Sequence, residues 1–402
     1  MAYKVFSNGN ALNASELNTY LMNQSVISFA STTARDAALT VPVEGQLVWL
    51  EDSNKYVYYT GSAWSDLIPA VASAPSGNAI INGAFEINQR AFSSSTSGGY
   101  GFDRWKNGQA GGTVTYSAQA FTPGTAPVAG YESKNFARIV TSGHSGASDY
   151  SVFQQVVEDV RTFAGQTATY SFWAKASSGT PKVALEIVQD FGTGGSPSAA
   201  VQTYAGQVTL TTSWARYSIT IAVPSISGKT FGTEGGNLSM NLWMSAGTTF
   251  NARTGSLGVQ NNTFDVWGFQ LESGSTATTF KRNANSIQGE LAACQRYYYR
   301  MTAATTSDVF SQPGIAWSST NCQITLSNPV TMRVQPTSVE FSNVRISDVV
   351  GAVIVATNVS VNNSTLQTAN LGITVASGLT NYRTYQLVAN TAPSFIGVSA
   401  EL

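Results

Sequence analysis

The sequence predicts a mostly β protein in which helices are short and few. Three observations support this fold class. Apolar and polar residues alternate with a period of two in several segments, as they do in strands with one buried face. Clusters of glycine, serine, threonine and proline bound these segments, as turns bound strands. Residues 79–285 contain no long segment with helical periodicity, which excludes a doubly wound α/β fold.

The composition limits the classes of function. Of 402 residues only 11% are charged, against ~25% in typical soluble proteins, and the formal net charge is −1. Lysine and arginine form no run, whereas nucleic-acid binding needs a basic surface, so we expect no nucleic-acid partner. The N-terminal residues lack the apolar stretch of a signal peptide, and no apolar run approaches the ~18 residues that span a bilayer. We therefore expect synthesis in a cytoplasm and no membrane insertion.

The cysteines and the single histidine exclude a usual Cys/His zinc site and a disulfide framework. Cys294 and Cys322 are too few for a disulfide framework in a chain of 402 residues. Together with His144 they cannot supply the four ligands of a usual Cys/His zinc site. We interpret Cys294 as a buried apolar residue. His144 lies among glycine and serine, and we interpret it as a solvated loop residue.

Residues 1–68 are predicted to form an N-terminal module of short helices and a β meander. Asn13 or Ser15 can cap a first helix, and Thr33 can cap a second. Apolar side chains at helical spacing follow the first cap: Leu17, Tyr20 and Leu21. Residues 44–68 then alternate as short strands with turns between them. Because so small a module has no sufficient core, we expect it to be stabilised by oligomerisation.

Residues 69–78 are small and flexible, and they predict a linker.

Residues 79–285 are predicted to form a central jelly-roll β-sandwich. Their alternating apolar and polar residues, bounded by turns, are typical of antiparallel strands with one buried face. The clearest alternating runs are residues 168–173, 216–223 and 238–244.

Residues 286–300 are predicted to be a helical connector that begins at the cap Ser286. Residues 301–402 return to strands and predict a smaller C-terminal β-sandwich. One of its predicted strands covers residues 338–346. The tyrosines at 297–299 are interpreted as an interface.

Four phrases occur in a characteristic order between residues 82 and 298. They are Asn-Gly-Ala-Phe-Glu at 82–86, Asp-Arg-Trp at 103–105, Gln-Leu-Glu-Ser-Gly at 270–274 and Cys-Gln-Arg-Tyr-Tyr at 294–298. This order resembles the jelly-roll module, of carbohydrate-binding type, in tail fibre and minor tail proteins of bacteriophages. The resemblance implies a homotrimeric fibre in the virion tail. Its N-terminal end would be held by a tail or baseplate protein, and its distal end would face the host.

The function implied is that of a receptor-binding protein, which attaches the virion to a bacterial surface glycan or protein. One alternative is a structural fibre or decoration protein without receptor contact. A second is a glycan depolymerase, which would need two carboxylates at a suitable separation. The pairs considered are Glu158 with Asp159, which are adjacent, and Glu186 with Asp190, which lie on or beside a strand. Neighbours along a strand point to opposite faces, so Glu158 and Asp159 are poor partners if extended. We therefore expect no enzyme activity and no required cofactor.

Four residues are candidates for binding. Jelly rolls of the carbohydrate-binding type often hold a structural calcium, and the resemblance places Glu86 and Asp265 at its ligand positions. The alternative is that each carboxylate pairs with an arginine, namely Arg90, Arg104 or Arg138. Trp173 and Trp243 lie opposite the apolar sides of their strands and are candidates for stacking on a glycan.

The Asp-Arg-Trp phrase has a structural interpretation. We expect Arg104 to form an ion pair and Trp105 to be a buried indole, so that the phrase ties a strand to a loop.

Overall fold

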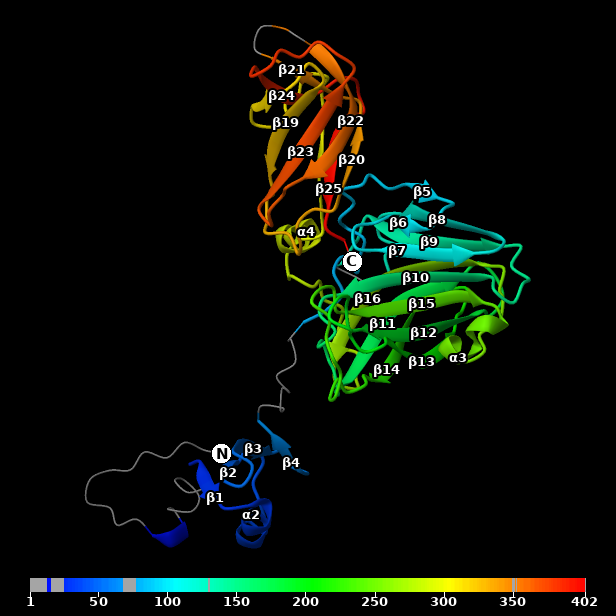
Figure 1. The fold of residues 1–402 in the computed structure, drawn as a ribbon. Helices are drawn as coiled ribbons and strands as arrows, with labels where there is room; N and C mark the ends of the chain where they lie inside the picture. The colour runs from blue at the N-terminus through cyan, green and yellow to red at the C-terminus, as the bar shows by residue number, and fades with distance from the viewer. Residues whose placement is uncertain are drawn as a thin grey trace. The chain divides into compact units, whose positions relative to one another are not determined.

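The computed structural model describes residues 13–15, 25–67, 77–128, 131–348, 351 and 353–401. The chain divides into two compact units, Met1–Ala74 and Pro75–Leu402 (Figure 1). Most of the predicted linker, residues 69–78, lies outside the described residues. None of the helices in the described ranges is long and apolar enough to cross a membrane.

The first unit contains a four-stranded sheet in the order β1-β2-β3-β4. Strand β1 runs parallel to β2, and the other pairs are antiparallel. The strands span Ile27–Phe29, Leu47–Leu50, Lys55–Tyr59 and Trp64–Asp66. Alternate residues of β2 and β3 point inward, so Val48, Leu50 and Val57 form a small core. The predicted meander is confirmed, and β1 adds a strand that the alternation did not reveal.

Helix α2 spans Thr32–Ala38 and begins earlier than predicted. Its cap is Ser31, whose hydroxyl accepts a hydrogen bond from the Ala34 amide at 3.2 Å. The predicted cap at Thr33 is wrong, because consecutive serine and threonine residues offer equivalent caps and the sequence does not rank them. The other predicted helix, around Leu17, lies outside the described residues.

The second unit begins with a jelly roll of two six-stranded sheets. The first, called the β15 sheet, has the order β13-β12-β15-β10-β7-β6. Its strands span Val201–Thr209, Lys182–Asp190, Asn237–Ala246, Tyr150–Val157, Lys106–Ala110 and Gly99–Tyr100. The second, called the β16 sheet, has the order β14-β11-β16-β9-β8-β5. Its strands span Ala215–Ala222, Thr167–Ala176, Thr263–Ser273, Asn135–Ser142, Thr113–Ala120 and Ser94–Ser95.

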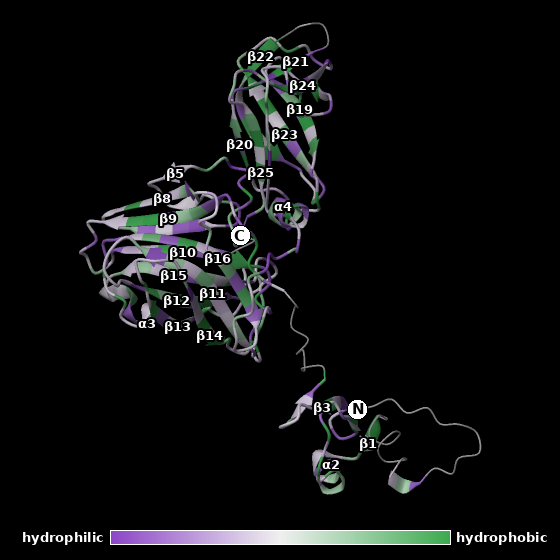
Figure 2. Cartoon of the chain, turned by 180° about the vertical axis from the view of Figure 1, so that it is seen from behind, coloured by the Kyte–Doolittle hydropathy of each residue, from purple (hydrophilic) through white to green (hydrophobic). Residues whose placement is uncertain are grey.

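Hydrophobic and hydrophilic residues alternate along many of these strands (Figure 2), and the apolar faces of both sheets bury aromatic rings. Trp105 stacks on Phe153 with ring centroids 4.7 Å apart, and Phe269 lies 4.5 Å from Trp105. The Trp105 indole also donates to the Asn82 carbonyl at 2.9 Å. Gly83 has to be a glycine, because a Cβ there would lie 2.2 Å from the Phe269 carbonyl oxygen. The expectation that Trp105 is buried is confirmed.

Helix α4, Ile287–Gln295, follows the jelly roll. As predicted, Ser286 caps it, accepting from the Gly289 amide at 3.0 Å. The buried Glu290 carboxylate accepts hydrogen bonds from the backbone amides of Asn82 and Ala284. The helix ends at Gln295, short of residue 300, where the predicted helical connector ends. The chain then continues as strand β17, which begins at Tyr298.

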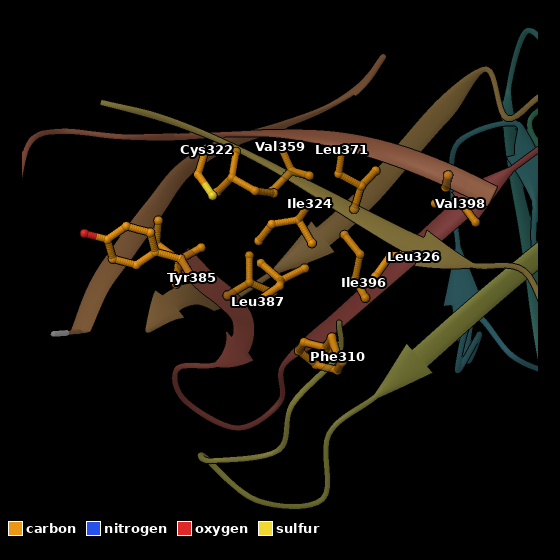
Figure 3. Close-up of a cluster of buried hydrophobic side chains, with 14 of the residues drawn as sticks. Phe310, Cys322, Ile324, Leu326, Val359, Leu371, Tyr385, Leu387, Ile396 and Val398 are labelled. Atoms are coloured by element: carbon orange, nitrogen blue, oxygen red, sulfur yellow. The ribbon is translucent and has the colours of Figure 1, made fainter. Parts of the chain in front are cut away.

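The C-terminal domain contains a closed barrel and a three-stranded sheet. The barrel has the order β18-β19-β23-β22-β21-β24, with strands Gly314–Ala316, Asn321–Ser327, Thr368–Val375, Val353–Asn362, Val344–Ser347 and Thr384–Ala389. The sheet has the order β17-β25-β20, with strands Tyr298–Thr302, Phe395–Ser399 and Ser338–Ser342. Both share one core, in which Ile324 and Leu387 of the barrel join Ile396 of β25 (Figure 3).

This domain confirms the predicted C-terminal β fold and shows how it closes: β24 pairs with both β18 and β21. The single strand predicted at 338–346 is wrong. It is divided between β20 and β21 at Asn343, whose φ of 49° breaks the extended chain.

The jelly roll and the C-terminal domain are joined by a buried arginine. Arg104 is 1% exposed, forms an ion pair with Glu401 and donates to the Val156 carbonyl at 2.5 Å. Its guanidinium lies 3.5 Å from the ring centroid of Tyr297. Burial alone would lower the pKa of Arg104, but the Glu401 carboxylate outweighs it and raises the pKa. The ion pair expected for Arg104 is confirmed, and Tyr297 belongs to an interface within the chain.

Replacing Glu401 with alanine is expected to destabilise the second unit by about 3–5 kcal/mol, because it leaves a buried charge without its partner. The free energy of unfolding in urea measures this loss. Asp159→Ala is the control, since it removes an ion pair to Arg161 whose side chains are 43% and 59% exposed. An exposed pair contributes less than about 1 kcal/mol, so equal losses in the two variants would contradict the role of Glu401.

Candidate functional site

The outer face of the β15 sheet carries polar side chains along its central strand. Leu238, Met240 and Leu242 of β15 are fully buried against the other sheet. Because side chains alternate along a strand, the residues between them point to the opposite face. Asn241 and Trp243 therefore lie on the outer face.

The register of the strands aligns five of these outer-face residues in one row. Asn241 pairs with Gln154 of β10 on one side and with Glu186 of β12 on the other. Gln154 in turn pairs with Lys106 of β7, and Glu186 with Tyr204 of β13. This polar row, Lys106–Gln154–Asn241–Glu186–Tyr204, crosses five strands of one sheet.

A buried carboxylate holds the row in place. Glu186 is 0% exposed and accepts two hydrogen bonds from Arg253, at 2.6 and 2.9 Å. It also accepts from the Asn241 amide at 3.0 Å and from the Trp243 indole at 3.1 Å. A buried charge is tolerated only when it is paired and hydrogen-bonded, and Glu186 satisfies both conditions. The Asn241 side chain is therefore fixed in orientation.

Arg253 belongs to a short helical segment that covers one end of the row. The 3-10 turn η2 spans Thr248–Phe250, and helix α3 spans Asn251–Thr254. Gln207 of β13 anchors the segment by donating to the Thr254 carbonyl at 2.7 Å. Gly255, at φ 61°, ends it against Tyr204, and a Cβ there would lie 2.4 Å from the tyrosine ring.

The same segment covers the predicted stacking residue Trp243. Its ring is 2% exposed, with Phe250 at 5.2 Å and Tyr150 at 5.7 Å between centroids, and the Arg253 guanidinium 4.9 Å away. A ring without a free face cannot stack on a sugar. The prediction for Trp243 is wrong, because strand alternation identifies the face on which a residue lies but not the segment that covers it.

The rest of the row offers hydrogen-bonding groups to a ligand. Asn241 is 6% exposed, and its Oδ1 has no hydrogen-bond partner among the described residues. A buried acceptor without a partner in the chain is uncommon, and in proteins such atoms are usually satisfied by an ordered water or another donor. Gln154 is half-buried and its amide makes no hydrogen bond to a described residue, while Tyr204 is 40% exposed. An acceptor, an amide and a ring in one rigid row match the hydroxyl groups and apolar face of a sugar.

Trp173, the other stacking candidate, lies on the opposite sheet. It pairs with Trp267 across β11 and β16, and their ring centroids are 5.5 Å apart. The Arg216 guanidinium lies 4.7 Å from its ring, and the side chain is half-buried. The structure therefore separates the two predicted tryptophans, and the role of Trp173 in stacking stays a prediction.

Both predicted calcium ligands are engaged by arginines. Glu86 accepts from Arg282 at 2.5 and 2.6 Å, and Asp265 accepts from Arg138 at 2.7 and 2.9 Å. A guanidinium on both oxygens of a carboxylate repels a cation, so these residues do not fit calcium. Nor do the described residues contain any group of three or more His, Cys, Asp or Glu side chains that could hold a metal. The alternative of arginine pairing is confirmed for Asp265, whose partner Arg138 was named, whereas the partner of Glu86 is Arg282, which was not.

The carboxylates considered for glycan cleavage do not form a catalytic pair. Glu158 accepts from Arg296 and from the Tyr297 hydroxyl, both at 2.8 Å. Burial raises the pKa of Glu158, but these hydrogen bonds outweigh it and hold the pKa below its ordinary value, whereas a general acid needs a raised pKa. Asp190 lies four residues from Glu186 along one strand, roughly 13 Å away, beyond the ~10 Å that separates a catalytic pair.

The polar row was not predicted as a site, although one signal for it exists. Glu186 interrupts an otherwise apolar strand, residues 183–188. A charge at such a position needs a buried partner, which points to a tertiary ion pair. The partner Arg253 could not be found, because it lies 67 residues away in a segment without strand alternation.

No family model and no curated protein sequence matches this chain. Solved structures that are similar to it include the enzymatically active domain of tailspike protein 4 from bacteriophage CBA120. That likeness has 13% identity, covers 50% of this chain and 22% of that one, and has a TM-score of 0.29. The family 11 carbohydrate-binding module of Clostridium thermocellum, solved with a mixed-linked tetrasaccharide, has 12% identity, 46% and 99% coverage and a TM-score of 0.28.

The CBM22-1 xylan-binding domain of Paenibacillus barcinonensis Xyn10C is similar at 12% identity, over 51% of this chain and 100% of that one, with a TM-score of 0.29. At TM-scores this low none of these likenesses bears on the ligand. The function therefore has to be argued from the residues of this chain.

His144 is buried rather than solvated, contrary to the prediction. It is 2% exposed, and its Nδ1 lies 2.8 Å from the Ser245 hydroxyl, which is itself fully buried. The loop can close over the ring because Gly112, at φ 53°, has no Cβ, and one there would lie 2.4 Å from the imidazole. The glycine at this position therefore marks close packing of the loop and not exposure to solvent. A serine–histidine pair closed to solvent cannot attack a substrate.

The stability of the second unit is expected to fall as the pH drops below ~6.5, the ordinary pKa of histidine. Burial lowers the pKa of His144, so the unfolded chain takes up its proton at a higher pH than the folded chain does. The loss should level off below the pKa of the folded state. Urea unfolding between pH 7.5 and pH 5, compared with His144→Gln, measures it. Because His144 is the only histidine, an identical pH dependence in the variant would contradict this account.

Proposed function

We propose that this chain is a virion attachment protein of bacteriophage tail-fibre type, and that its jelly roll binds a bacterial surface glycan at the polar row. The observation that carries the proposal is the orphan acceptor Asn241 Oδ1, fixed by Glu186 beside the Gln154 amide and the Tyr204 ring. The four phrases that resemble tail fibre proteins support a place in the virion tail.

The chemistry of the surface supports a sugar over a charged ligand. Only 11% of the residues are charged. The carboxylate of the row, Glu186, is paired with Arg253 and not offered to solvent. The other groups of the row are the Gln154 and Asn241 amides, the Tyr204 phenol and the Lys106 ammonium, whose Nζ lies 5.9 Å from the Tyr100 ring. Amide and phenol groups exchange hydrogen bonds with sugar hydroxyls.

Two rivals differ from this proposal in a measurable way. A structural fibre or decoration protein would bind no glycan. A depolymerase would release reducing ends from a polysaccharide that it binds, and the engagement of Glu158, Glu186 and their neighbours speaks against that activity.

Removing the polar groups of the row is expected to weaken glycan binding about tenfold or more, because each lost hydrogen bond contributes ~0.5–1.5 kcal/mol. The full chain and Gln154→Ala/Asn241→Ala would be applied to an array of bacterial surface glycans, and the strongest ligand titrated by calorimetry. Ser218→Ala/Thr220→Ala, on the other sheet, is the matched control. Equal affinities of the two double variants would sink the proposed site, and release of reducing ends would favour the depolymerase.

We further propose that the protein is a homotrimer, with a tail or baseplate protein holding its N-terminal end. The first unit supports this, because its core of Val48, Leu50 and Val57 is small for an independent domain.

Light scattering of the full chain is expected to give three times the chain mass of 42.5 kDa. A monomer at micromolar concentration would contradict the trimer and favour a decoration protein or a single binding module.

A further inference from the structure

Two exposed aromatic rings lie on neighbouring turns of the C-terminal barrel. Tyr382 is 81% exposed and Trp317 is 48% exposed, more than the other aromatic side chains of the described residues. Trp317 directly follows β18, and Tyr382 shortly precedes β24. Because β18 and β24 are paired, the two turns emerge from the same part of the barrel.

Backbone hydrogen bonds hold these turns together. The Tyr382 amide donates to the Ala316 carbonyl at 2.7 Å, and the Ala316 amide donates to the Arg383 carbonyl at 3.0 Å. The Leu379 amide donates to the Ser319 carbonyl at 3.1 Å. The backbone therefore holds residues Trp317 and Tyr382 at a fixed separation.

The Tyr382 turn is also anchored to the barrel on its inner side. Arg383 forms an ion pair with the buried Asp348 at 2.9 Å. The Thr380 amide donates at 3.0 Å to the hydroxyl of Tyr385, which lies at one end of the core cluster (Figure 3). These contacts fix the turn without using the Tyr382 side chain.

Tyr382 has an unfavourable backbone conformation for its residue type. Its φ is 63°, in the left-handed region that favours glycine and is uncommon for a bulky side chain. Strain of this kind is found where the surrounding structure enforces it, and it accumulates at functional positions. An exposed tyrosine that contributes nothing to the core and occupies a strained position has no evident structural role.

Neither ring makes an aromatic, cation or hydrogen-bond contact with another described residue. In the part of the chain that the structure describes, Trp317 and Tyr382 contact no other aromatic ring and no cation, and neither the indole nor the phenol forms a hydrogen bond. Around them lie the exposed residues Ser319, Thr380 and Asn381, together with Ile315 of β18, which is 46% exposed. The surface thus combines unoccupied rings with hydroxyl and amide groups.

We propose that Trp317 and Tyr382 form a second saccharide-binding site, which takes an uncharged sugar by stacking on its pyranose rings. The neighbouring charge of Arg383 is neutralised by Asp348, so the site offers nothing to a carboxylate or phosphate. A flat ring covers the apolar face of a pyranose, and serine, threonine and asparagine side chains bind its hydroxyls. A protein partner would need a continuous apolar patch, whereas the polar side chains of Ser319, Thr380 and Asn381 lie beside the two rings and Ile315. This site lies in the barrel and does not depend on the jelly-roll site.

The test uses the full chain with Gln154→Ala/Asn241→Ala as background, so that saccharide binding by the polar row is removed. On an array of uncharged bacterial oligosaccharides, followed by titration of the strongest ligand, we expect binding to persist. Trp317→Ala or Tyr382→Ala should then weaken it about three- to tenfold, the usual contribution of an aromatic contact. Val355→Ala, which removes a 52% exposed apolar side chain from the same barrel, should change the affinity less than about twofold.

Tyr382→Gly separates binding from folding. Glycine adopts a φ of 63° without strain. The melting temperature of the Tyr382→Gly variant should therefore be no lower than that of Tyr382→Ala, while the two variants should lose the same affinity for the saccharide. The proposal is overturned if the background variant binds no uncharged saccharide, or if the Trp317 and Tyr382 variants bind as the background does. Binding that requires a carboxylate or phosphate on the sugar would overturn the ligand class.

Discussion

The buried guanidinium of Arg104 is the constraint on which the second unit depends. Removed from water, this charge needs a carboxylate and further acceptors, and a single domain does not supply them. The Val156 carbonyl comes from the jelly roll, whereas Tyr297 and Glu401 come from the chain that follows it. The jelly roll is therefore complete only when the C-terminal residues are in place. The phrases around Arg104 and Tyr297, almost 200 residues apart in the sequence, are the two sides of one buried contact.

The small number of charged residues also determines the character of the rest of the surface. With 11% charged residues, the protein places several of its charges in buried or half-buried pairs, including Glu186 with Arg253 and Asp265 with Arg138. Each pair fixes a segment: Glu186 holds α3 on the outer face of the β15 sheet, and Asp265 joins β16 to β9. Solvent then meets mainly hydroxyls, amides and a few aromatic rings. Such a surface has weak long-range electrostatics, so any specific binding has to come from short-range hydrogen bonds and stacking.

The sequence alone predicted those features of the structure that depend on residues close together in the chain. Period-two alternation located most strands, and Ser286 marked the start of α4, because alternation and capping depend on residues close in sequence. Contacts between distant residues could not be read in this way. Trp243 was assigned to the correct face, but the segment that covers it begins after β15 and is held by Gln207 of β13. Barrel closure through β24 and the loop packing of His144 likewise depend on partners far along the chain.

The two proposed saccharide sites are fixed by different means, and this has a consequence for binding. The polar row is aligned by sheet register, so its side chains lose little freedom when a ligand arrives. The Trp317–Tyr382 site is held by paired turns, and the strained backbone at Tyr382 keeps its ring exposed. Each site offers a ligand only a few side chains, so each alone would bind weakly. In the proposed trimer every chain would present both sites, so a repeating polysaccharide could engage several at once. Binding to a cell surface would then rest on effective concentration more than on the affinity of any one site.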